Sequence, residues 1–357
     1  MNAGYTLNRR GFLIRSLAAA GATAGAGMVP GLLAPRSAQA AGALVYSGFG
    51  GSYEQAIRAA VLDPYAQARG IALATATGGS DVAKVSSMVK AGRTEWDLLD
   101  AQGTTLAQFA ANGLLEPIDP AIAASADVFD RSLITPHSIP WYQFSLNLFW
   151  NSEAISGELQ SWADVWNVQK YPGKRAFSNL PWFSLEVALL ADGVPKDKLY
   201  PLDVDRAFAS LDRIKKHAVF LSASGLANAI SAQEVVTGIV NLARLKAVQK
   251  AGVKVRYSWE QAVFDIQQLV VPKGAPNKEN AFGAIAYSLQ PDSQKRVLEL
   301  LGYTPTLKPV LAGIDPKQAE DLPGTDATRH KGFYLNADWW GKNGAAVSRR
   351  WQDWLAA

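Results

Sequence analysis

Residues 44–63 read LVYSGFGGSYEQAIRAAVLD, a short apolar run followed by a glycine-rich loop and a helical pattern. The apolar run predicts a strand, and the face that carries Ile57, Ala60 and Val61 predicts a helix with one buried side. Pro64 continues this face and is expected to end or kink the helix, because proline has no N–H to donate. Strand, loop and helix in this order predict the first unit of an α/β fold.

The same alternation repeats twice more in the first half of the chain. Strands are predicted at residues 71–76 and 98–101, and helices at residues 81–91 and 106–112. The glycines that follow the three helical patterns are Gly70, Gly92 and Gly113. A glycine suits the left-handed conformation in which many helices end. Alternation of this kind indicates a mostly parallel sheet with helices on both faces.

The second half of the chain shows the alternation less regularly. Asp203 is placed to cap a helix. The strands predicted here are residues 218–221, 238–241, 254–257 and 269–272. The helices predicted beyond them are residues 278–288 and 291–301, with a C-terminal helical segment at 339–355. The chain is long enough for two domains of ordinary size.

The N-terminal segment, residues 1–40, has the pattern of an export signal. Arg9-Arg10 stands directly before an apolar run, residues 13–33, and Ala38-Gln39-Ala40 follows the run. Paired arginines, a short apolar region and a small-residue end are typical of a twin-arginine signal peptide. We therefore expect cleavage after Ala40 and release into the periplasm. The alternative is a membrane anchor, but glycines interrupt the run and few Leu, Ile or Val occupy it.

The charge balance argues against two kinds of partner. Residues 1–40 hold four arginines and no acid, and the whole chain has 35 Lys and Arg against 31 Asp and Glu, so the rest of the chain is formally neutral. A neutral chain has no general attraction to nucleic acid or anionic lipid, and we expect no nucleic-acid partner. The chain has no cysteine, which excludes disulfides, thiolate metal sites and a lipid attached to cysteine.

No motif indicates a cofactor, a metal or catalysis. In the loop Gly48–Tyr53 a dinucleotide fingerprint would need glycine at the last position, so NAD is excluded. The loop is either a ligand-binding turn at a helix start or a plain tight turn. The histidines are His137, His217 and His330. Their spacing fits neither a metal site nor a nucleophile–base pair, and we expect no cofactor, no metal and no enzymatic activity.

Two charged residues and several aromatic clusters are candidates for a ligand site. Asp265 interrupts an apolar run, where it either pairs with an amine or is a solvated loop charge. Arg244 follows a strand-to-helix junction. Its planar guanidinium either binds a carboxylate or is an exposed charge on a helix. The aromatic clusters lie at 141–149, 182–183 and 259–264. Each aromatic alone is an ordinary core residue, but the set suits a partly aromatic cleft around an ammonium.

Four blocks of sequence stand in a characteristic order along the chain. They are GLLEPID at 113–119, SWADVW at 161–166 with YPGKR at 171–175, LEVALLADG at 185–193, and VPKGAPNK at 271–278. Together they resemble the spermidine/putrescine-type solute-binding proteins of ABC transporters, over residues 44 to about 310. Each block alone is weakly specific, and their order together with an export signal makes the resemblance strong.

The resemblance implies an α/β fold of the periplasmic-binding-protein class, type II-like. Two lobes with mixed sheets flanked by helices would close on the ligand, and the chain would cross between them twice, near 145–151 and 265–272. The expected divisions are 41–147 with 268–330 for the first lobe, 148–267 for the second, and 331–357 for a C-terminal helical segment. The ligand would lie between the lobes, at strand ends and helix starts.

The resemblance also implies which residues line the cleft. They are Phe49, Gly50, Gly51, Ser52, Gln102, Gly103, Phe144, Trp182, Phe183, Asn241, Arg244, Asp265 and Gln267. The chain departs from the polyamine binders at Ser178-Asn179 and at Gln267, where acids are common in that family. A ligand with two positive charges would meet too few carboxylates here, which favours a less positive ligand such as a zwitterionic ω-amino acid. Arg244 would then hold its carboxylate and Asp265 its amine.

The implied function is that of a monomeric periplasmic receptor. It would capture a small amine, either a polyamine or a related compound, and deliver it to an ABC permease in the inner membrane. The same fold could instead bind a zwitterionic ω-amino acid, an organophosphonate or a sugar-derived compound. A receptor that signals to a membrane sensor without transport is a further reading. The rival class is an exported enzyme, which no catalytic motif supports.

Overall fold

The computed structural model describes residues 42–78 and 81–357. The twin-arginine motif and the predicted cleavage site after Ala40 lie outside the described residues, so both stay predictions. The described residues form one compact unit, which is built around a single large mixed sheet.

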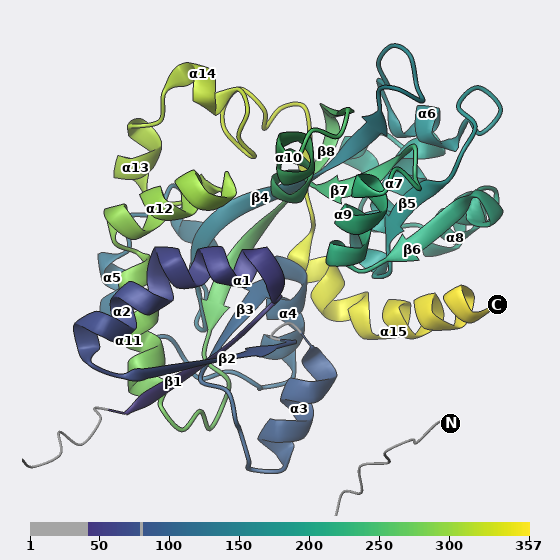
Figure 1. Cartoon of the computed structure of the whole chain (residues 1–357). Coiled ribbons are helices and arrows are strands. Elements are labelled where there is room, and N and C mark those ends of the chain that lie inside the picture. Colours follow the sequence, from purple (N-terminus) through teal and green to yellow (C-terminus); the bar gives the residue numbers. More distant parts are fainter. Residues whose placement is uncertain (1–41, 79–80) are drawn as a thin grey trace, which may run out of the picture. The chain divides into compact units, whose positions relative to one another are not determined.

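In the described residues this sheet has ten strands. Figure 1 labels the eight main strands. The bounds of all ten are β1 Ala43–Gly48, β2 Ala72–Thr77, β3 Leu98–Gln102, β4 Ile139–Asn151, β5 Arg175–Ser178, β6 Ala218–Leu221, β7 Thr237–Asn241, β8 Val255–Val270, β9 Thr304–Pro305 and β10 Phe333–Tyr334. The main strands follow the order β2-β1-β3-β8-β4-β7-β5-β6, and the short strands β9 and β10 add to β4 and β8.

Strand directions change along the sheet. At one end β1 runs parallel to β2 and β3, and at the other end β5 runs parallel to β6 and β7. Between these two parallel groups, β8 is antiparallel to β3 and β4, and β4 is antiparallel to β7. The mixed sheet that the resemblance implied is confirmed, and β4 and β8 are the strands that join the two parallel groups.

The helices that the sequence predicted are present, and further helices that it did not predict lie between them. Their bounds are α1 Gly51–Ile57, a π-helical segment Arg58–Leu62, α2 Asp63–Arg69, α3 Val82–Lys90, α4 Gly103–Ala111, α5 Pro120–Ser125, α6 Trp162–Trp166, α7 Pro181–Ala191, α8 Val204–Asp212, α9 Ala223–Ser231, α10 Leu242–Lys250, α11 Lys278–Ser288, α12 Pro291–Leu301, α13 Lys308–Ala312, α14 Pro316–Ala319 and α15 Ala337–Ala356. Short 3-10 turns lie at Arg131–Leu133, Lys196–Lys198 and Lys215–His217.

The predicted helix ends are confirmed at their capping residues. Gly70, Gly92 and Gly113 each have φ of 63°, the left-handed conformation that glycine adopts without strain. Asp203 caps α8 by accepting a hydrogen bond from the N–H of Arg206 at 3.0 Å. In contrast, α4 begins earlier than predicted, directly where β3 ends.

Helices cover both faces of each parallel group, as predicted. On β3, Leu98 belongs to the buried cluster of Ile57, which lies in α1, whereas its neighbour Leu99 belongs to the cluster of Val85 and Phe109, which lie in α3 and α4. Consecutive strand residues point to opposite faces, so these two clusters lie on opposite sides of the sheet. The same division runs through β7, whose consecutive residues also belong to different clusters.

Pro64 was expected to end or kink the first helix, and it does not end the helical run. The chain continues from α1 through the π-helical segment into α2, and Pro64 is near the start of α2. Because Pro64 has no N–H, the carbonyl of Ala60 lacks its usual helical donor. That carbonyl accepts a hydrogen bond from Nε of Arg296 at 2.8 Å instead. The donor comes from α12, far along the chain, so local sequence could not reveal it.

The long strand β8 corrects a second prediction. The runs 254–257 and 269–272 were predicted as separate strands, but they fall at the two ends of one strand of 16 residues. Leu146 of β4 pairs with Val263 and Leu148 pairs with Ser258, so the residues between them in β8 bulge out of the ladder. A bulge breaks the alternation of inward and outward residues, which hides the continuity of the strand in the sequence.

Every residue of β4 is buried. β8 pairs with one edge of this strand, and β7 and the short strand β9 pair with parts of the other edge. A strand buried on both faces reads as a continuous apolar run rather than as an alternation. The aromatic cluster at 141–149 is therefore part of the central strand of the sheet, and one of the two predicted crossings, 145–151, lies within it.

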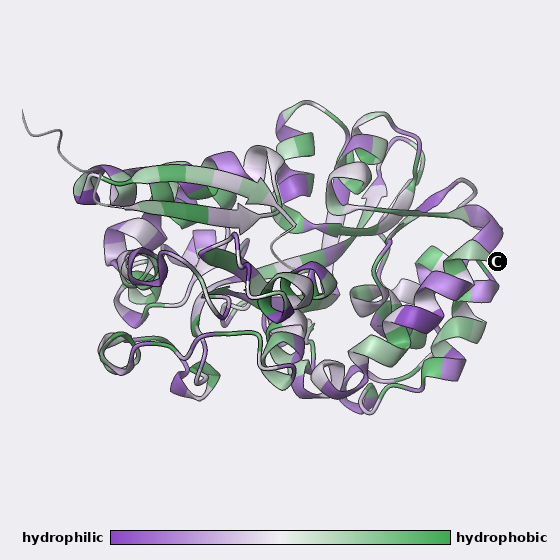
Figure 2. Cartoon of the chain, turned by 90° about the horizontal axis from the view of Figure 1, so that it is seen from below, coloured by the Kyte–Doolittle hydropathy of each residue, from purple (hydrophilic) through white to green (hydrophobic). Residues whose placement is uncertain are grey.

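The C-terminal helix α15 packs against both α4 and α7. Its buried residues are Trp340, Gly344, Val347 and Trp351, which lie on one face at helical spacing. Figure 2 shows hydrophilic and hydrophobic residues alternating along this helix, which ends at the label C. Nε1 of Trp351 donates to the carbonyl of Asn179 at 2.8 Å, which ties the helix to the turn before α7.

The described residues contain no helix that combines the length and the apolar character needed to cross a membrane.

Candidate ligand-binding site

Strand register brings several predicted site residues to one region of the sheet. Phe144 of β4 is paired with Asp265 of β8, and Gln102 of β3 is paired with Gln267 of β8. Asn241 ends β7 and pairs with β4. The ends of β3 and β7 therefore flank the β4–β8 pair at the point where Asp265 lies.

Asp265 is a buried acid with one unsatisfied oxygen. The side chain is only 5% exposed. Its Oδ1 atom accepts a hydrogen bond from the N–H of Ile266 at 2.7 Å, and the N–H of Gly103 also donates to the carboxylate. Gly103 is the first residue of α4, so its N–H has no partner within the helix and is available for this bond. The Oδ2 atom is buried and has no hydrogen-bond partner among the described residues.

The electrostatics of Asp265 favour a bound cation. Burial raises the pKa of this carboxyl to about 7, against the two backbone hydrogen bonds, which lower it. The negative charge of Glu186 adds to the rise. A positive charge placed at the free oxygen would favour the ionised form and reverse the shift.

The turn from β3 into α4 approaches Asp265 closely. Gln102 is half-buried and opens the helix, with its N–H donating to Oγ1 of Thr105 at 3.0 Å. A Cβ on Gly103 would lie 2.9 Å from Oδ1 of Asp265. Glycine is therefore the residue that leaves room for the carboxylate to receive the helix N–H.

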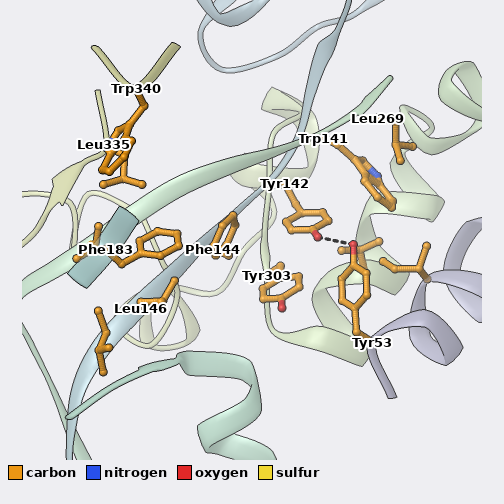
Figure 3. Packing of buried hydrophobic residues seen from close by; sticks show 14 of the residues in the cluster. Tyr53, Trp141, Tyr142, Phe144, Leu146, Phe183, Leu269, Tyr303, Leu335 and Trp340 are labelled. Atoms are coloured by element: carbon orange, nitrogen blue, oxygen red, sulfur yellow. Dashed lines mark hydrogen bonds between the residues drawn. The ribbon is translucent and has the colours of Figure 1, made fainter. Parts of the chain in front are cut away.

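Three tyrosines and two phenylalanines form one aromatic group beside β4, and Figure 3 shows its members Tyr53, Tyr142, Phe144 and Tyr303. The rings of Tyr142 and Tyr303 stack with centroids 4.6 Å apart. Phe144 lies 6.2 Å from Tyr303, and Phe49 lies 5.5 Å from Tyr53, measured between ring centroids. The predicted site contained the two phenylalanines but none of the tyrosines.

The tyrosine hydroxyls are tied to a second buried acid, Asp100. Tyr53 donates to Oδ2 of Asp100 at 2.8 Å, Tyr46 donates to the same atom, and Gln267 also bonds to this carboxylate. The hydroxyl oxygens of Tyr53 and Tyr142 are 2.7 Å apart. Burial raises the pKa of Asp100 to about 7 against these hydrogen bonds. Its position directly after the apolar Leu98-Leu99 was the signal in the sequence that could have identified it.

Asn241 and Arg244 reach the aromatic group from the turn between β7 and α10. Asn241 caps α10 by accepting from the N–H of Arg244 at 3.3 Å, and the hydroxyl of Tyr303 donates to the same oxygen at 3.4 Å. Burial raises the pKa of Tyr303 to about 12, against the positive charge of Arg244, which lowers it. Arg244 is therefore near the Tyr303 end of the group.

The irregular first turn of α7 brings Phe183 beside Phe144 (Figure 3). Phe183 has φ of 72°, a conformation that residues other than glycine seldom adopt and that recurs at functional sites. Trp182 packs edge-on against Trp340, with ring centroids 6.0 Å apart. The indole Nε1 of Trp182 is buried and has no hydrogen-bond partner among the described residues.

The first glycine loop lies at the border of this region. Gly50 and Gly51 have φ of 69° and 63°, so both need glycine for the turn into α1. Gly51 and Ser52 are exposed, and Phe49 is 39% exposed. Through its contact with Tyr53, Phe49 is the residue that links this loop to the aromatic group.

The two surface pockets described for this structure lie away from the candidate site. They have volumes of about 490 and 540 Å³ and are lined by other residues, such as Trp259 and Lys246. Within the described part of the chain, no group of three or more His, Asp or Glu side chains is placed to hold a metal ion. The candidate site is therefore defined by its buried polar atoms and its aromatic rings.

Comparison with known proteins identifies the family. The sequence model of the family called bacterial extracellular solute-binding protein matches residues 60–324 of this chain. The γ-aminobutyric acid-binding protein of Pseudomonas aeruginosa is 32% identical over 314 residues, which are 86% of this chain and 89% of that protein. The chain belongs to the bacterial extracellular solute-binding proteins.

The resemblance noted in the sequence is confirmed as well. The spermidine/putrescine-binding periplasmic protein of Escherichia coli is 25% identical over 252 residues, which are 66% of this chain and 70% of that protein.

Solved structures share the fold. The PBP AgtB from Agrobacterium tumefaciens R10, in complex with agropinic acid, has a TM-score of 0.83 and 34% identity, with 88% of this chain and 99% of that chain covered. The Atu4243-GABA receptor has a TM-score of 0.79 and 34% identity, with 87% and 97% covered. The periplasmic-binding-protein fold predicted from the sequence is confirmed.

Proposed function

We propose that this protein is a periplasmic receptor that captures a small amine and delivers it to an ABC permease. The observation that carries the proposal is the Oδ2 atom of Asp265, which is buried, has no partner among the described residues and lies in the ladder opposite Phe144. A buried carboxylate without a partner is costly, and an ammonium is its natural complement. Aromatic faces add cation–π attraction.

A ligand screen followed by calorimetry tests this proposal. A primary amine or amino acid should raise the melting temperature, because a ligand that binds only the native state stabilises it by mass action. Asp265→Asn should weaken binding by about 2–5 kcal/mol, the usual result of breaking a buried charge pair. Asp63→Asn, which changes an exposed acid paired with Arg58, is the matched control and should bind like the parent. Parent-like affinity of Asp265→Asn would remove Asp265 from the site.

A zwitterionic ω-amino acid is the second candidate ligand. Arg244 lies near Tyr303, whereas Asp265 is paired with Phe144, so opposite charges stand beside different members of one aromatic group. An ω-amino acid carries opposite charges at its two ends. Relatives whose names state γ-aminobutyric acid as ligand support this candidate.

We infer two lobes, divided as the sequence predicted. Residues 41–147 with 268–330 hold one parallel group of strands, residues 148–267 hold the other, and β4 and β8 connect them. The C-terminal segment 331–357 contacts α4 on one side and α7 on the other. Closure on the ligand should reduce the radius of gyration in solution scattering. An unchanged radius with saturating ligand would argue against closure.

We infer export by the twin-arginine route, with cleavage after Ala40. Intact-mass analysis of the periplasmic protein should show a chain that begins at Ala41. Replacing Arg9 and Arg10 together by lysine should leave the precursor in the cytoplasm, because this route reads the arginine pair. Normal export of that variant would rule out the route.

We further infer a monomeric receptor without enzymatic activity. Size-exclusion chromatography with light scattering should give the mass of one mature chain. A metal assay together with a turnover screen on the bound ligand separates the receptor from an exported enzyme, since a receptor returns its ligand unchanged. Ligand uptake by cells that lack the gene separates a transport receptor from one that only signals.

A further inference from the structure

Asp321 joins two parts of the chain that the proposed lobe division separates. It follows α14, in the range 268–330, whereas its partners lie in the range 148–267. Nζ of Lys246 in α10 donates to the carbonyl oxygen and to Oδ2 of Asp321, both at 2.7 Å. The hydroxyl of Tyr257 in β8 donates to Oδ1. Every acceptor oxygen of Asp321 thus receives a hydrogen bond from the other proposed lobe, and Figure 1 shows the segment after α14 running toward α10.

The loop that carries Asp321 is fixed to its own lobe. The carbonyl oxygen of Leu322 accepts a hydrogen bond from Oγ1 of Thr328 at 2.7 Å. The carbonyl oxygen of Pro323 accepts one from Oγ1 of Thr304 in β9 at 2.6 Å. Both threonines are fully buried. Because the loop is already ordered, forming the contact costs little further conformational entropy.

The ion pair of Lys246 and Asp321 is distinctive among the ion pairs of the described residues. It alone joins the range 148–267 with the ranges 41–147 and 268–330; the others lie within one proposed lobe or reach the C-terminal segment. The two side chains are 28% and 54% exposed, so dissolved salt screens the pair in part. Burial raises the pKa of Tyr257, and its hydrogen bond to Asp321 adds to the rise, so Tyr257 stays a donor at neutral pH.

The described arrangement is nearer to a liganded relative than to an open one. AgtB in complex with agropinic acid is 34% identical and has a TM-score of 0.83. The PBP AttC from the Agrobacterium tumefaciens C58 strain, in an open unliganded conformation, is 30% identical and has a TM-score of 0.64, with 88% of this chain and 99% of that chain covered. Asp265, at the candidate site, is also buried. These observations support a closed arrangement, in which the bonds of Asp321 are bonds of the closed form.

We propose that Asp321, Lys246 and Tyr257 form a latch that holds the two lobes closed and so sets how long a ligand stays bound. The proposal rests on the proposed function, which includes closure on the ligand. None of the three residues belongs to the candidate site. Bonds made only in the closed form raise its population, and the apparent affinity rises with the population of the competent form. Because the ligand leaves only after the lobes open, the latch acts on the dissociation rate.

Asp321→Ala is the deciding variant, since it removes both side-chain acceptors. With 4-aminobutyrate and 1,4-diaminobutane as probes, stopped-flow kinetics should show dissociation roughly 3- to 10-fold faster, as for a half-exposed ion pair reinforced by a hydrogen bond, and unchanged association. Both probes should change by the same factor, because Asp321 touches neither. High salt should narrow the difference from the parent. Asp127→Ala breaks an exposed pair with Lys308 at 3.5 Å inside one lobe and is the matched control.

A distance between the lobes gives a readout that a structural role would not move. The chain has no cysteine, so two introduced cysteines can carry spin labels specifically. Ser87→Cys in α3 and Ser231→Cys in α9 place one label on an exposed helix position of each lobe. Without ligand, double electron–electron resonance should show a shorter, closed distance in the parent, and Asp321→Ala should lose part of that population. Lys246→Ala removes the pair from the other lobe and should act in the same direction.

The outcomes separate this inference from the proposed function. Parent-like dissociation and parent-like distances in Asp321→Ala overturn the inference alone. Faster dissociation of only one probe also overturns it, because Asp321 would then touch the ligand. Parent-like affinity in Asp265→Asn overturns the proposed function. If the parent binds neither probe, the proposed function loses its support, and equal distance distributions in parent and variant overturn the inference. If Asp321→Ala does not fold, Lys246→Ala decides by the same measurements.

Discussion

The rings of Tyr142 and Tyr303 stack face to face, with centroids 4.6 Å apart and planes 12° from parallel. The buried carboxylate of Asp100 acts on this stack through the hydroxyl of Tyr53. When Asp100 is ionised, Tyr53 gives its only hydroxyl proton to it, so the hydroxyl of Tyr142 must donate to Tyr53. The acid thus fixes the direction of the hydrogen bonds that hold the aromatic group.

Replacing Tyr303 separates the ring from its hydroxyl. Tyr303→Ala should lower the free energy of unfolding by about 3–5 kcal/mol, since it removes a buried ring from the stack. Tyr303→Phe keeps the ring and loses only the 3.4 Å hydrogen bond to Asn241, so it should cost less than about 1.5 kcal/mol. Urea unfolding followed by tryptophan fluorescence measures both. Equal losses would mean that the hydroxyl, and not the stack, stabilises this region.

Arg244→Ala distinguishes the two ligand classes. If the ligand is a zwitterionic amino acid, removing the guanidinium should weaken binding by about 2–5 kcal/mol, because the carboxylate loses its charged partner. If the ligand is a simple diamine, the same variant should bind equally well or better, because a repelling cation is gone. Calorimetry with the ligand found in the screen gives the answer. Arg256→Ala, at an exposed cation paired with Glu158, is the control.

Stability without ligand should fall as the pH rises from about 4 to about 7. In the folded state Asp100 and Asp265 have pKa values raised to about 7, so they keep protons that the unfolded chain has already released. Their contribution to the free energy of unfolding is complete below the pKa that these groups have in the unfolded chain. It is lost as the pH rises through the pKa that they have in the folded chain, by up to about 1.4 kcal/mol per pH unit for each group. Denaturant unfolding at several pH values tests this. The stability of Asp265→Asn should fall less steeply with pH than that of the parent. An identical slope would contradict a raised pKa for Asp265.

Gly103→Ala tests the close approach of α4 to Asp265. The added Cβ would stand 2.9 Å from Oδ1, so either the carboxylate or the helix start must move. We expect a loss of stability of about 1–3 kcal/mol, the usual cost of overpacking, together with weaker ligand binding. Gly113→Ala also replaces a glycine but far from any contact, so it should cost stability through its left-handed φ and leave binding intact. Parent-like binding in Gly103→Ala would show that the carboxylate position is not critical.

The sequence predicted most of the short strands, but not β5, and it predicted the two long central strands poorly. The strands at 71–76, 98–101 and 218–221 lie near the sheet's ends or carry clear turn signals, and they were placed almost correctly. The central strands β4 and β8 were missed or divided. One is buried on both faces and the other contains a bulge, and both conditions remove the alternation on which strand prediction depends.

The candidate site was predicted in part for a similar reason. Asp265 was predicted as a site residue because a charge inside an apolar run is conspicuous, and Phe144 was predicted from the aromatic cluster. Glu186 carries the same signal, because it lies in a helix whose residues 183–190 are all buried. It lies in LEVALLADG, one of the blocks that carry the family resemblance, and it was not predicted as a site residue. The contacts between Asp100, Tyr53 and Tyr142 join residues from three separate segments, which local sequence patterns do not reveal.

The irregular ladder between β4 and β8 has a mechanical consequence. Two paired strands resist sliding, because a slip of one residue would break every ladder bond and turn each side chain to the opposite face. They are more compliant where a bulge has already opened the ladder, as it has near Leu146. If the two parallel strand groups close on a solute, we expect the sheet to bend and twist at this point, and β4 and β8 to keep their register.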